Sequence, residues 1–132
     1  MSEENVEVVR QLSEHWERGD WVTGRELFDH RCELVFSVSG FPDPGLYRYG
    51  RDSLRAWSGF VDAFDEFDAE VEEIVEAGEL VVAFVRIRCR GRASGADIDA
   101  RAGNIFTFRE GKIVRWVLTD RSEALEAVGL SE

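Results

Sequence analysis

The hydrophobic period of this chain changes halfway along, and that change limits the fold more than any other feature. Up to about residue 65, apolar residues recur every three or four positions, which is the spacing of helices. Beyond that point they alternate with polar residues in four runs, at about 67–77, 80–91, 96–109 and 112–120. We therefore predict an α+β fold in which an antiparallel meander follows a helical first half.

The first half predicts more helix than strand. Helical spacing and capping residues indicate helices at about 3–18, 20–28 and 51–65, and a short last helix at 122–128. Between them we expect a turn at 29–30, a strand at 33–38 and an irregular loop at 39–50, which holds both prolines. Three N-terminal helices would then lie inside a curved antiparallel sheet and form a cone-shaped α+β barrel.

Opposite charges determine the register that we predict for the first hairpin. If residues 78–80 form its loop, three arginines meet three acids across the strands, in the pairs Arg86–Glu72, Arg88–Glu70 and Arg90–Asp68. Such pairs contribute about 0.2–1 kcal/mol each, and a slip of one residue would turn the arginines toward the apolar face. We interpret the arginines as one side of a charge ladder and not as an anion-binding patch.

For the last hairpin we expect a type I turn followed by a glycine bulge, because this register keeps one face apolar. It predicts the pairs Phe106–Val114, Asn104–Trp116, Ala102–Leu118 and Ala100–Asp120. The inward face of the four strands then carries Val71, Val75, Val81, Ala83, Val85, Ile87, Ala100, Ala102, Asn104, Phe106, Val114, Trp116, Leu118 and Asp120.

The inner face of the predicted sheet indicates a ligand site, and the outer face indicates a contact with a second subunit. Ala83, Ala100 and Ala102 fill a core poorly, so we expect a ligand-sized hollow between the sheet and the helices. The outward face also holds apolar residues, namely Leu80, Val82, Phe84, Ile105, Ile113 and Val117. Because these apolar side chains would otherwise be exposed to solvent, we expect a homodimer through the outer face of the sheet.

Composition excludes several classes of function. A chain of 132 residues is expected to form a single domain over 1–132, and its net charge of −11 disfavours nucleic-acid and membrane partners. No apolar stretch approaches the roughly 20 residues of a membrane span, and the acidic start lacks the features of a signal segment, so we expect a cytoplasmic protein. Cys32, Cys89, His15 and His30 lack metal-ligand spacing, so we expect neither a metal nor another cofactor.

Four segments of the chain, taken together, resemble one family. They read ENVEVVRQLSEHWERGD, PDPGLYRYGRDSLRAWSGF, IDARAGNIFTFREGKIVRW and DRSEALEAVGL. They resemble a SnoaL-like member of the nuclear transport factor 2-like superfamily. The resemblance implies a cone-shaped barrel with an interior ligand pocket, commonly in a homodimer. That superfamily includes ketosteroid isomerases, polyketide cyclases, epoxide hydrolases, dehydratases and proteins without catalytic activity, so the fold alone does not determine the function.

The resemblance also points to particular site residues. Ketosteroid isomerases use an aspartate base, with a tyrosine and a protonated aspartate as donors. The matching positions here are about Phe36, Leu12 and Asn104, so that mechanism does not carry over. SnoaL-like cyclases keep an acid near the end of the last strand, where Asp120 lies. The resemblance therefore implies Asp120 as the acid–base group, and the Asn104 amide on the same face could donate to an enolate oxygen.

Each candidate also has a structural explanation. Asp120 begins the sequence Asp-Arg-Ser-Glu, which is the spacing of a capping box, so it could cap the last helix instead. The Asn104 amide could bond to a neighbouring loop. Glu73 alternates into the inward set and is a further acid–base candidate at the mouth of the cone. Candidate pocket walls, which could equally form the core, are Trp16, Phe36, Phe41, Tyr47, Trp57, Phe106 and Trp116.

The sequence leaves two functions open. One is a pocket for a small, mostly apolar, carbonyl-bearing or cyclic molecule, with cofactor-independent acid–base chemistry of the isomerase, cyclase or hydratase type. The other is a non-catalytic homodimeric ligand-binding or accessory domain. Because an enzyme needs a titratable group that the ligand can reach, Asp120 is the residue that separates the two.

Overall fold

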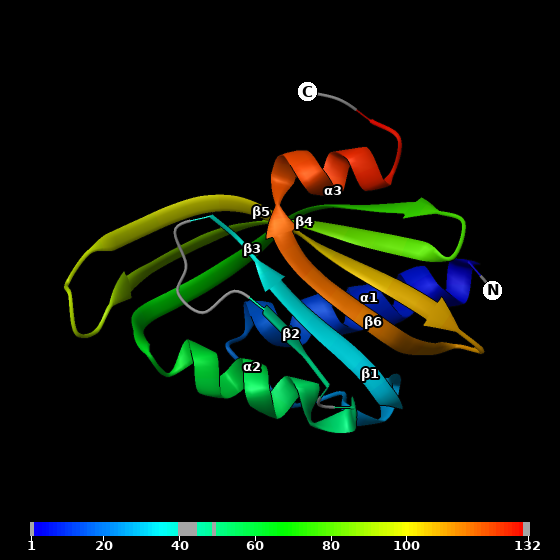
Figure 1. Cartoon of the computed structure of the whole chain (residues 1–132), viewed down its shortest axis with the longest axis horizontal. Coiled ribbons are helices and arrows are strands. Elements are labelled where there is room, and N and C mark those ends of the chain that lie inside the picture. The colour runs from blue at the N-terminus through cyan, green and yellow to red at the C-terminus, as the bar shows by residue number, and fades with distance from the viewer. Residues whose placement is uncertain (1, 40–44, 49, 131–132) are drawn as a thin grey trace.

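A six-stranded curved sheet with helices on both faces makes up the structure (Figure 1). The computed structural model describes residues 2–39, 45–48 and 50–130. In chain order the elements are α1 (Ser2–Glu17), the 3-10 turn η1 (Arg25–Leu27), β1 (Phe28–Ser37), β2 (Gly45–Tyr47), the 3-10 turn η2 (Gly50–Asp52), α2 (Ser53–Val61), β3 (Phe64–Ala77), β4 (Leu80–Gly91), β5 (Asp97–Arg109), β6 (Lys112–Asp120) and α3 (Arg121–Ala127).

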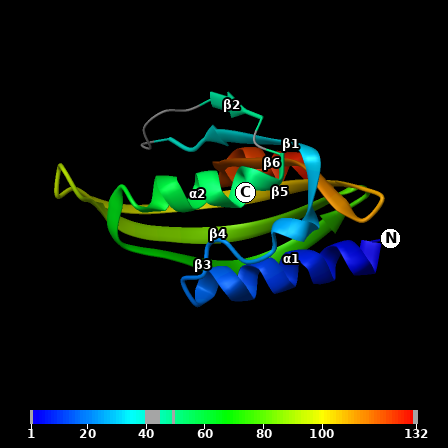
Figure 2. The same ribbon diagram turned by 90° about the horizontal axis from the view of Figure 1, so that it is seen from below.

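The sheet is mixed and not purely antiparallel as predicted. Its strand order is β2-β1-β6-β5-β4-β3, and β3 to β6 form the expected antiparallel meander. β1, however, pairs with β6 in the parallel direction and with the short β2 in the antiparallel direction. Figure 2 shows β1 and β2 at one edge of the sheet and α1 beside β3 at the other. Strand alternation reports which faces are buried but carries no information on the direction of the neighbouring strand.

The prediction of three N-terminal helices was wrong. α1 and α2 form close to their predicted ranges, but only the single 3-10 turn η1 forms in the predicted range 20–28. Asp20 does accept the backbone N–H groups of Val22 and Thr23, as a capping residue would. The predicted turn at 29–30 lies inside β1, and the predicted loop at 39–50 contains β2.

A shorter turn than predicted and two irregularities in β3 change the register of the first hairpin. The strands are joined by a two-residue turn, and the register shifts between Val71 and Glu73 and again between Asp65 and Asp68. An extra residue at such a bulge reverses the alternation of faces. Val75 was predicted to point inward, but it pairs with Val82 and packs in the second apolar cluster on the other face.

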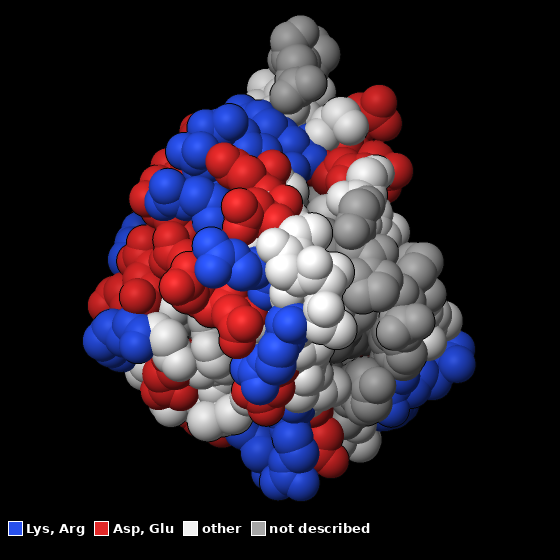
Figure 3. Space-filling model, turned by 90° about the vertical axis from the view of Figure 1, so that its left-hand side faces the viewer, with Lys and Arg blue, Asp and Glu red and all other residues white. Residues whose placement is uncertain are grey.

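The charge ladder itself is present, with different partners. Arg86, Arg88 and Arg90 lie opposite Glu70, Asp68 and Asp65, two or three positions from the predicted pairs. Their ion pairs are Arg86–Asp99 at 2.7 Å, Arg88–Asp68 at 3.6 Å and Arg90–Asp97 at 3.1 Å. Figure 3 shows the resulting pattern of interleaved basic and acidic side chains. Because the arginines lie between two acidic strands, β5 supplies two of the three partners.

The last hairpin also differs from its predicted register. Arg109 pairs with Lys112 across a two-residue turn, in which Glu110 and Gly111 have positive φ values of 52° and 77°. These values fit a type I′ turn and not the predicted type I turn with a glycine bulge. A bulge at Val114 then restores the alternation, so that Phe106 faces Trp116, Asn104 faces Leu118 and Ala102 faces Asp120.

The helices divide the apolar residues into two clusters. α1 and α2 cover the inner face of the sheet, where most of the predicted inward residues are buried. Ile113, predicted to point outward, is fully buried in this core, whereas Val114 is only half-buried. On the outer face, Val82 and Phe84 pack under Ala124 and Leu125 of α3. α3 therefore covers part of the surface that we expected a second subunit to cover.

Candidate functional site

A buried hydrogen bond determines the orientation of Asn104. The Trp116 Nε1–H donates to Asn104 Oδ1 at 2.7 Å, and the two residues are 0% and 4% exposed. Because an indole N–H can only donate, the atom that faces it must be the amide oxygen. The oxygen of Asn104 is therefore used within the protein, and its NH₂ group is the end that remains to donate to another acceptor. The bond joins neighbouring strands, not Asn104 to a loop.

Indole and phenyl rings occupy the interior beside this pair. The Trp16 ring stacks on Trp116 at 5.2 Å between centroids, and Phe106 stacks on Trp116 at 5.8 Å. Trp57 meets Trp116 edge to face at 5.8 Å. Ala83 and Ala102 are buried in the same core. We predicted a hollow beside the small inward residues. Large rings from α1, α2 and β6 lie in this part of the interior.

Trp57 connects the buried rings to rings that reach the surface. It contacts Trp21, Phe36, Phe60 and Phe67, whose centroids lie 5.4–6.1 Å away. These four residues are half-buried, whereas Trp57 is 3% exposed. We call the set the aromatic cluster; it consists of Trp16, Trp21, Phe36, Trp57, Phe60, Phe67, Phe106 and Trp116. It contains all four tryptophans of the chain.

Two indole N–H groups of the aromatic cluster lack a hydrogen-bond partner. Among the described residues, the buried side-chain atoms without one are Trp16 Nε1, Trp57 Nε1 and, near the start of α1, Asn5 Oδ1. An unpaired buried donor costs about 1–3 kcal/mol. Since the rings of Trp16 and Trp57 lie 6.3 Å apart, both unpaired donors belong to the same region of the interior.

Asp120 does not make the side-chain contact that its predicted capping role requires. Its carboxylate instead accepts the backbone N–H of Ser39 at 2.8 Å and the Ser39 hydroxyl at 2.6 Å. It does lie opposite Ala102, one inward position beyond Asn104 along β5. Asp120 therefore joins the end of β6 to the residues that follow β1.

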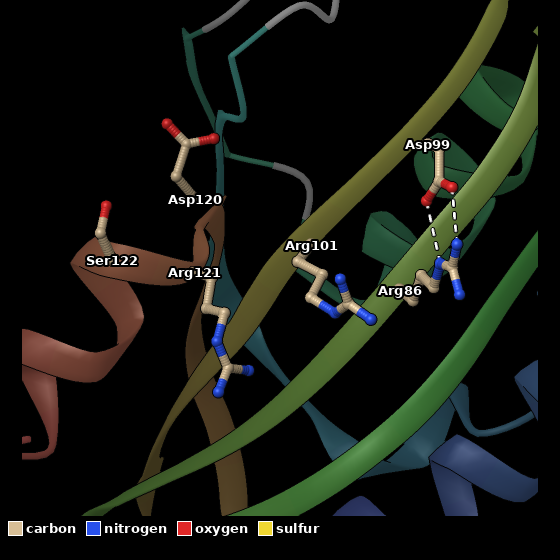
Figure 4. A pocket seen from close by; sticks show the side chains of 6 residues that line it. All are labelled: Arg86, Asp99, Arg101, Asp120, Arg121 and Ser122. Atoms are coloured by element: carbon tan, nitrogen blue, oxygen red, sulfur yellow. Dashed lines mark hydrogen bonds and ion pairs between the residues drawn. The ribbon is translucent and has the colours of Figure 1, made fainter. Parts of the chain in front are cut away.

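Asp120 also borders a polar groove on the outer face, of about 580 Å³ (Figure 4). In the groove Arg86 bonds to both carboxylate oxygens of Asp99, at 2.9 and 2.7 Å. The hydrogen bond from Arg86 keeps the pKa of Asp99 below its ordinary value. Arg101 reaches Glu72 at 3.2 Å, and Arg121 lies over the Phe84 ring. Since Arg86, Asp99 and Arg101 are already in ion pairs within the chain, this part of the groove is a continuation of the charge ladder.

Other predicted site residues fall outside the aromatic cluster. Glu73 is exposed and lies opposite Phe84 on the outer face, because the bulge in β3 reverses the alternation. It is therefore not an inward acid. Phe41 lies outside the described residues, and for Tyr47 the described part is its backbone in β2. Sequence reasoning did not identify Trp21, Phe60 or Phe67 as part of the site.

Acid–base and metal chemistry have few other candidates in the described part of the chain. Cys32 and Cys89 are free and buried, and burial raises the pKa of each thiol to about 11. A thiol of this kind is a poor nucleophile near neutral pH. Within residues 2–39, 45–48 and 50–130, no group of three or more His, Cys, Asp or Glu side chains could hold a metal ion. No helix in these ranges is long and apolar enough to cross a membrane.

Comparisons with known proteins agree with this fold. An NTF2-like protein from Burkholderia thailandensis E264 is 20% identical with a TM-score of 0.75, over 86% of this chain and 88% of that one. A protein from Jannaschia sp. CCS1 described as a SnoaL-like polyketide cyclase is 19% identical with a TM-score of 0.71, over 96% and 92%. A protein from Catenulispora acidiphila DSM 44928 with a ketosteroid isomerase-like fold, solved with trimethylamine, is 16% identical with a TM-score of 0.68, over 94% and 93%.

At these identities the solved structures establish a shared fold and nothing further. A search of curated protein sequences finds no match. The family model of the SnoaL-like domain, however, matches residues 9–116, which is most of the chain. The chain therefore belongs to the SnoaL-like family and has the nuclear transport factor 2-like fold.

Proposed function

We propose that the chain binds a small, mostly apolar, cyclic or carbonyl-bearing molecule at the aromatic cluster. The observation that carries the proposal is the Trp116–Asn104 bond, which leaves the amide NH₂ as a donor beside a wall of aromatic rings. Two relatives handle small molecules according to their descriptions, one as a polyketide cyclase and one in a complex with trimethylamine.

We further propose that this molecule undergoes cofactor-independent proton transfer. In the proposed reaction a C–H bond next to a carbonyl breaks, and the proton passes to the Asp120 carboxylate. The electron pair moves to the carbonyl oxygen, where the Asn104 amide donates to the developing enolate. Return of the proton to another carbon gives an isomer. Attack by the enolate carbon on a second carbonyl gives a ring, and the alkoxide that forms takes the proton back from Asp120. Each carboxylate oxygen of Asp120 already accepts one hydrogen bond from Ser39, so the proton goes to the remaining lone pair of one of these oxygens.

The test uses 2-acetylnaphthalene, an aromatic ketone with exchangeable protons next to its carbonyl. Binding is measured by quenching of the tryptophan fluorescence, and proton transfer by the loss of the methyl NMR signal in D₂O. We expect binding by the wild type and exchange above the rate in buffer. Asp120→Asn should bind the ketone and lose the exchange, whereas the control Asp97→Asn, at an exposed residue on the outer face, should retain both.

The same experiment separates the catalytic proposal from the non-catalytic alternative. Binding without exchange in the wild type would show a binding domain and contradict the proton-transfer step. In that case the two hydrogen bonds from Ser39 would be the role of the Asp120 carboxylate. No binding of the ketone would contradict the proposed site as a whole.

A further inference from the structure

We propose that the unpaired indole N–H groups of Trp16 and Trp57 recognise a carbonyl oxygen of the ligand. The inference rests on the proposed function, since it assumes that the aromatic cluster is the binding site. It adds the residues that select the ligand, namely two indole donors that require an acceptor oxygen on it.

Burial and chemistry identify the kind of group that these donors require. Trp16 and Trp57 are each 3% exposed, and each Nε1 lies without a partner. An indole N–H donates and cannot accept, so its partner must be an acceptor. The third indole of the buried core shows the same requirement, because Trp116 Nε1 is satisfied by the oxygen of Asn104.

A carbonyl oxygen matches the number and the surroundings of these donors. The carbonyl oxygen of a ketone has two lone pairs and can accept both hydrogen bonds at once. The enolate oxygen that forms in the proposed reaction gains a third lone pair, to which the Asn104 amide can donate. Trp16 and Trp57 approach from different helices, α1 and α2, and their ring centroids are 6.3 Å apart at an interplanar angle of 39°. The rest of a flat aromatic ketone would pack against the half-buried rings of Trp21, Phe36 and Phe67, which surround Trp57.

An organic cation is the competing ligand class for a set of aromatic rings. Ring faces attract ammonium groups, and the net charge of −11 would favour a cation at long range. The edge of an indole that carries the N–H is positive, however, and two such edges without partners disfavour a cation beside them. A site for a carbonyl oxygen should therefore prefer a ketone to an ammonium ion, and a site for an organic cation should prefer the ammonium ion.

The experiment compares two ligands of nearly the same shape. 2-Acetylnaphthalene carries a C=O group where 2-isopropenylnaphthalene carries a C=CH₂ group. Calorimetry on the wild-type protein should give a roughly tenfold preference for the ketone, as two net hydrogen bonds provide. Tetramethylammonium serves as the cation probe and should not compete with the ketone.

Three variants identify the donors. Trp16→Phe and Trp57→Phe keep an aromatic ring and remove one N–H each, so each should reduce the preference for the ketone by roughly threefold. Trp21→Phe removes an indole N–H that is not among the unpaired buried groups. It should lower both affinities by a similar factor and leave their ratio unchanged. Circular dichroism checks that each variant is folded.

The possible results separate this inference from the proposed function. Equal affinity of the wild type for both naphthalenes would overturn the role of the N–H groups. It would still agree with ligand binding at the aromatic cluster. A ketone preference that survives in both Trp16→Phe and Trp57→Phe would overturn the assignment of the donors. Displacement of the ketone by tetramethylammonium would favour the cation class and overturn the inference. If neither naphthalene binds, both proposals fail.

Discussion

At the scale of single residues, one hydrogen bond explains how the polar side chain of Asn104 is accommodated in an apolar interior. Asn104 would be an expensive residue in this core without Trp116, and Trp116 would bury a third unpaired N–H without Asn104. The two residues therefore depend on each other for stability.

Their mutual dependence can be measured with a double-mutant cycle. Trp116→Phe leaves the Asn104 oxygen unpaired and removes ring volume, so it should destabilise the protein by about 2–4 kcal/mol. Asn104→Leu leaves the Trp116 N–H unpaired. The double variant removes both polar partners and should be more stable than the sum of the single effects by about 1–3 kcal/mol, as measured by urea unfolding. Simple additivity would contradict the coupling.

Glu110 occupies a backbone conformation that suits other residues better. It has φ of 52° at the first position of the β5–β6 turn, where asparagine is favoured. Glu110→Asn should raise the free energy of unfolding by about 0.5–1 kcal/mol. Glu79→Asn is the matched control, because Glu79 lies in the other two-residue hairpin turn without a positive φ. An equal gain from both substitutions would show that the turn conformation is not the cause.

The two buried thiols make stability depend on pH in the alkaline range. Burial raises the pKa of Cys32 and of Cys89 to about 11 from the ordinary thiol value of 9.0. The unfolded chain therefore loses these protons at lower pH than the folded chain does, so stability is complete below pH 9 and falls as the pH rises toward 11. Urea midpoints at pH 8 and 10 should show a smaller fall for Cys32→Ala than for the wild type. An unchanged pH dependence would contradict this account.

At the scale of elements, a glycine allows α3 to lie directly on the sheet. A Cβ atom at Gly103 would lie 2.3 Å from the Cβ of Ala124, which is too close for any side chain. The absence of a side chain on β5 thus lets α3 approach and cover Val82 and Phe84.

Gly103→Ala should therefore displace α3 and destabilise the protein by about 1–3 kcal/mol. Dye binding to exposed apolar surface should increase at the same time, because Val82 and Phe84 lose their cover. Gly59→Ala is the control: Gly59 lies inside α2 with open space around a built Cβ, so it should stabilise by about 0.5–1 kcal/mol. Normal stability of Gly103→Ala would mean that α3 adjusts without loss.

The elements also show what could be predicted from the sequence. Alternation placed Asn104, Phe106 and Trp116 on one inward face, and the structure confirms it. It assigned Glu73 and Val114 to the wrong environment, because single-residue bulges reverse the alternation and leave no local signal.

The candidate site was predictable only in part. Trp57, Phe60, Phe64 and Phe67 recur every three or four residues, and this density of rings could have indicated the aromatic cluster. The unpaired N–H groups and the bond between Asp120 and Ser39 depend on contacts between distant segments, which no local pattern encodes.

At the scale of the whole molecule, α3 covers part of the outer face through which we predicted a homodimer. α3 buries Val82 and Phe84, and Ile113 points inward, which leaves Leu80, Ile105 and Val117 half-buried. The arginines of the ladder are already paired within the chain. We therefore expect any contact through the outer face to be apolar at its centre and to be opposed by the net charge of −11 on each chain.

Sedimentation can test this prediction. The dimer should strengthen between about 0.01 M and 0.15 M salt, because screening weakens the repulsion between two acidic chains. Val117→Glu should reduce the dimer, whereas Leu46→Glu, at an exposed position on the edge strand β2, should not. A monomer at micromolar concentration under both salt conditions would contradict a dimer through this face.

The parallel pairing of β1 with β6 has a consequence for how the chain folds. Glu33 and Arg115, which lie opposite each other in this pair, are 82 positions apart. During synthesis β1 emerges long before β6, its main partner. The edge of β1 therefore lacks hydrogen bonds to β6 while the hairpins of β3 to β6 form from neighbouring segments. Closing so long a loop is entropically costly and slow. We expect docking of β1 to be the late event in refolding, and a nascent chain that stops before β6 to be prone to association through that open edge.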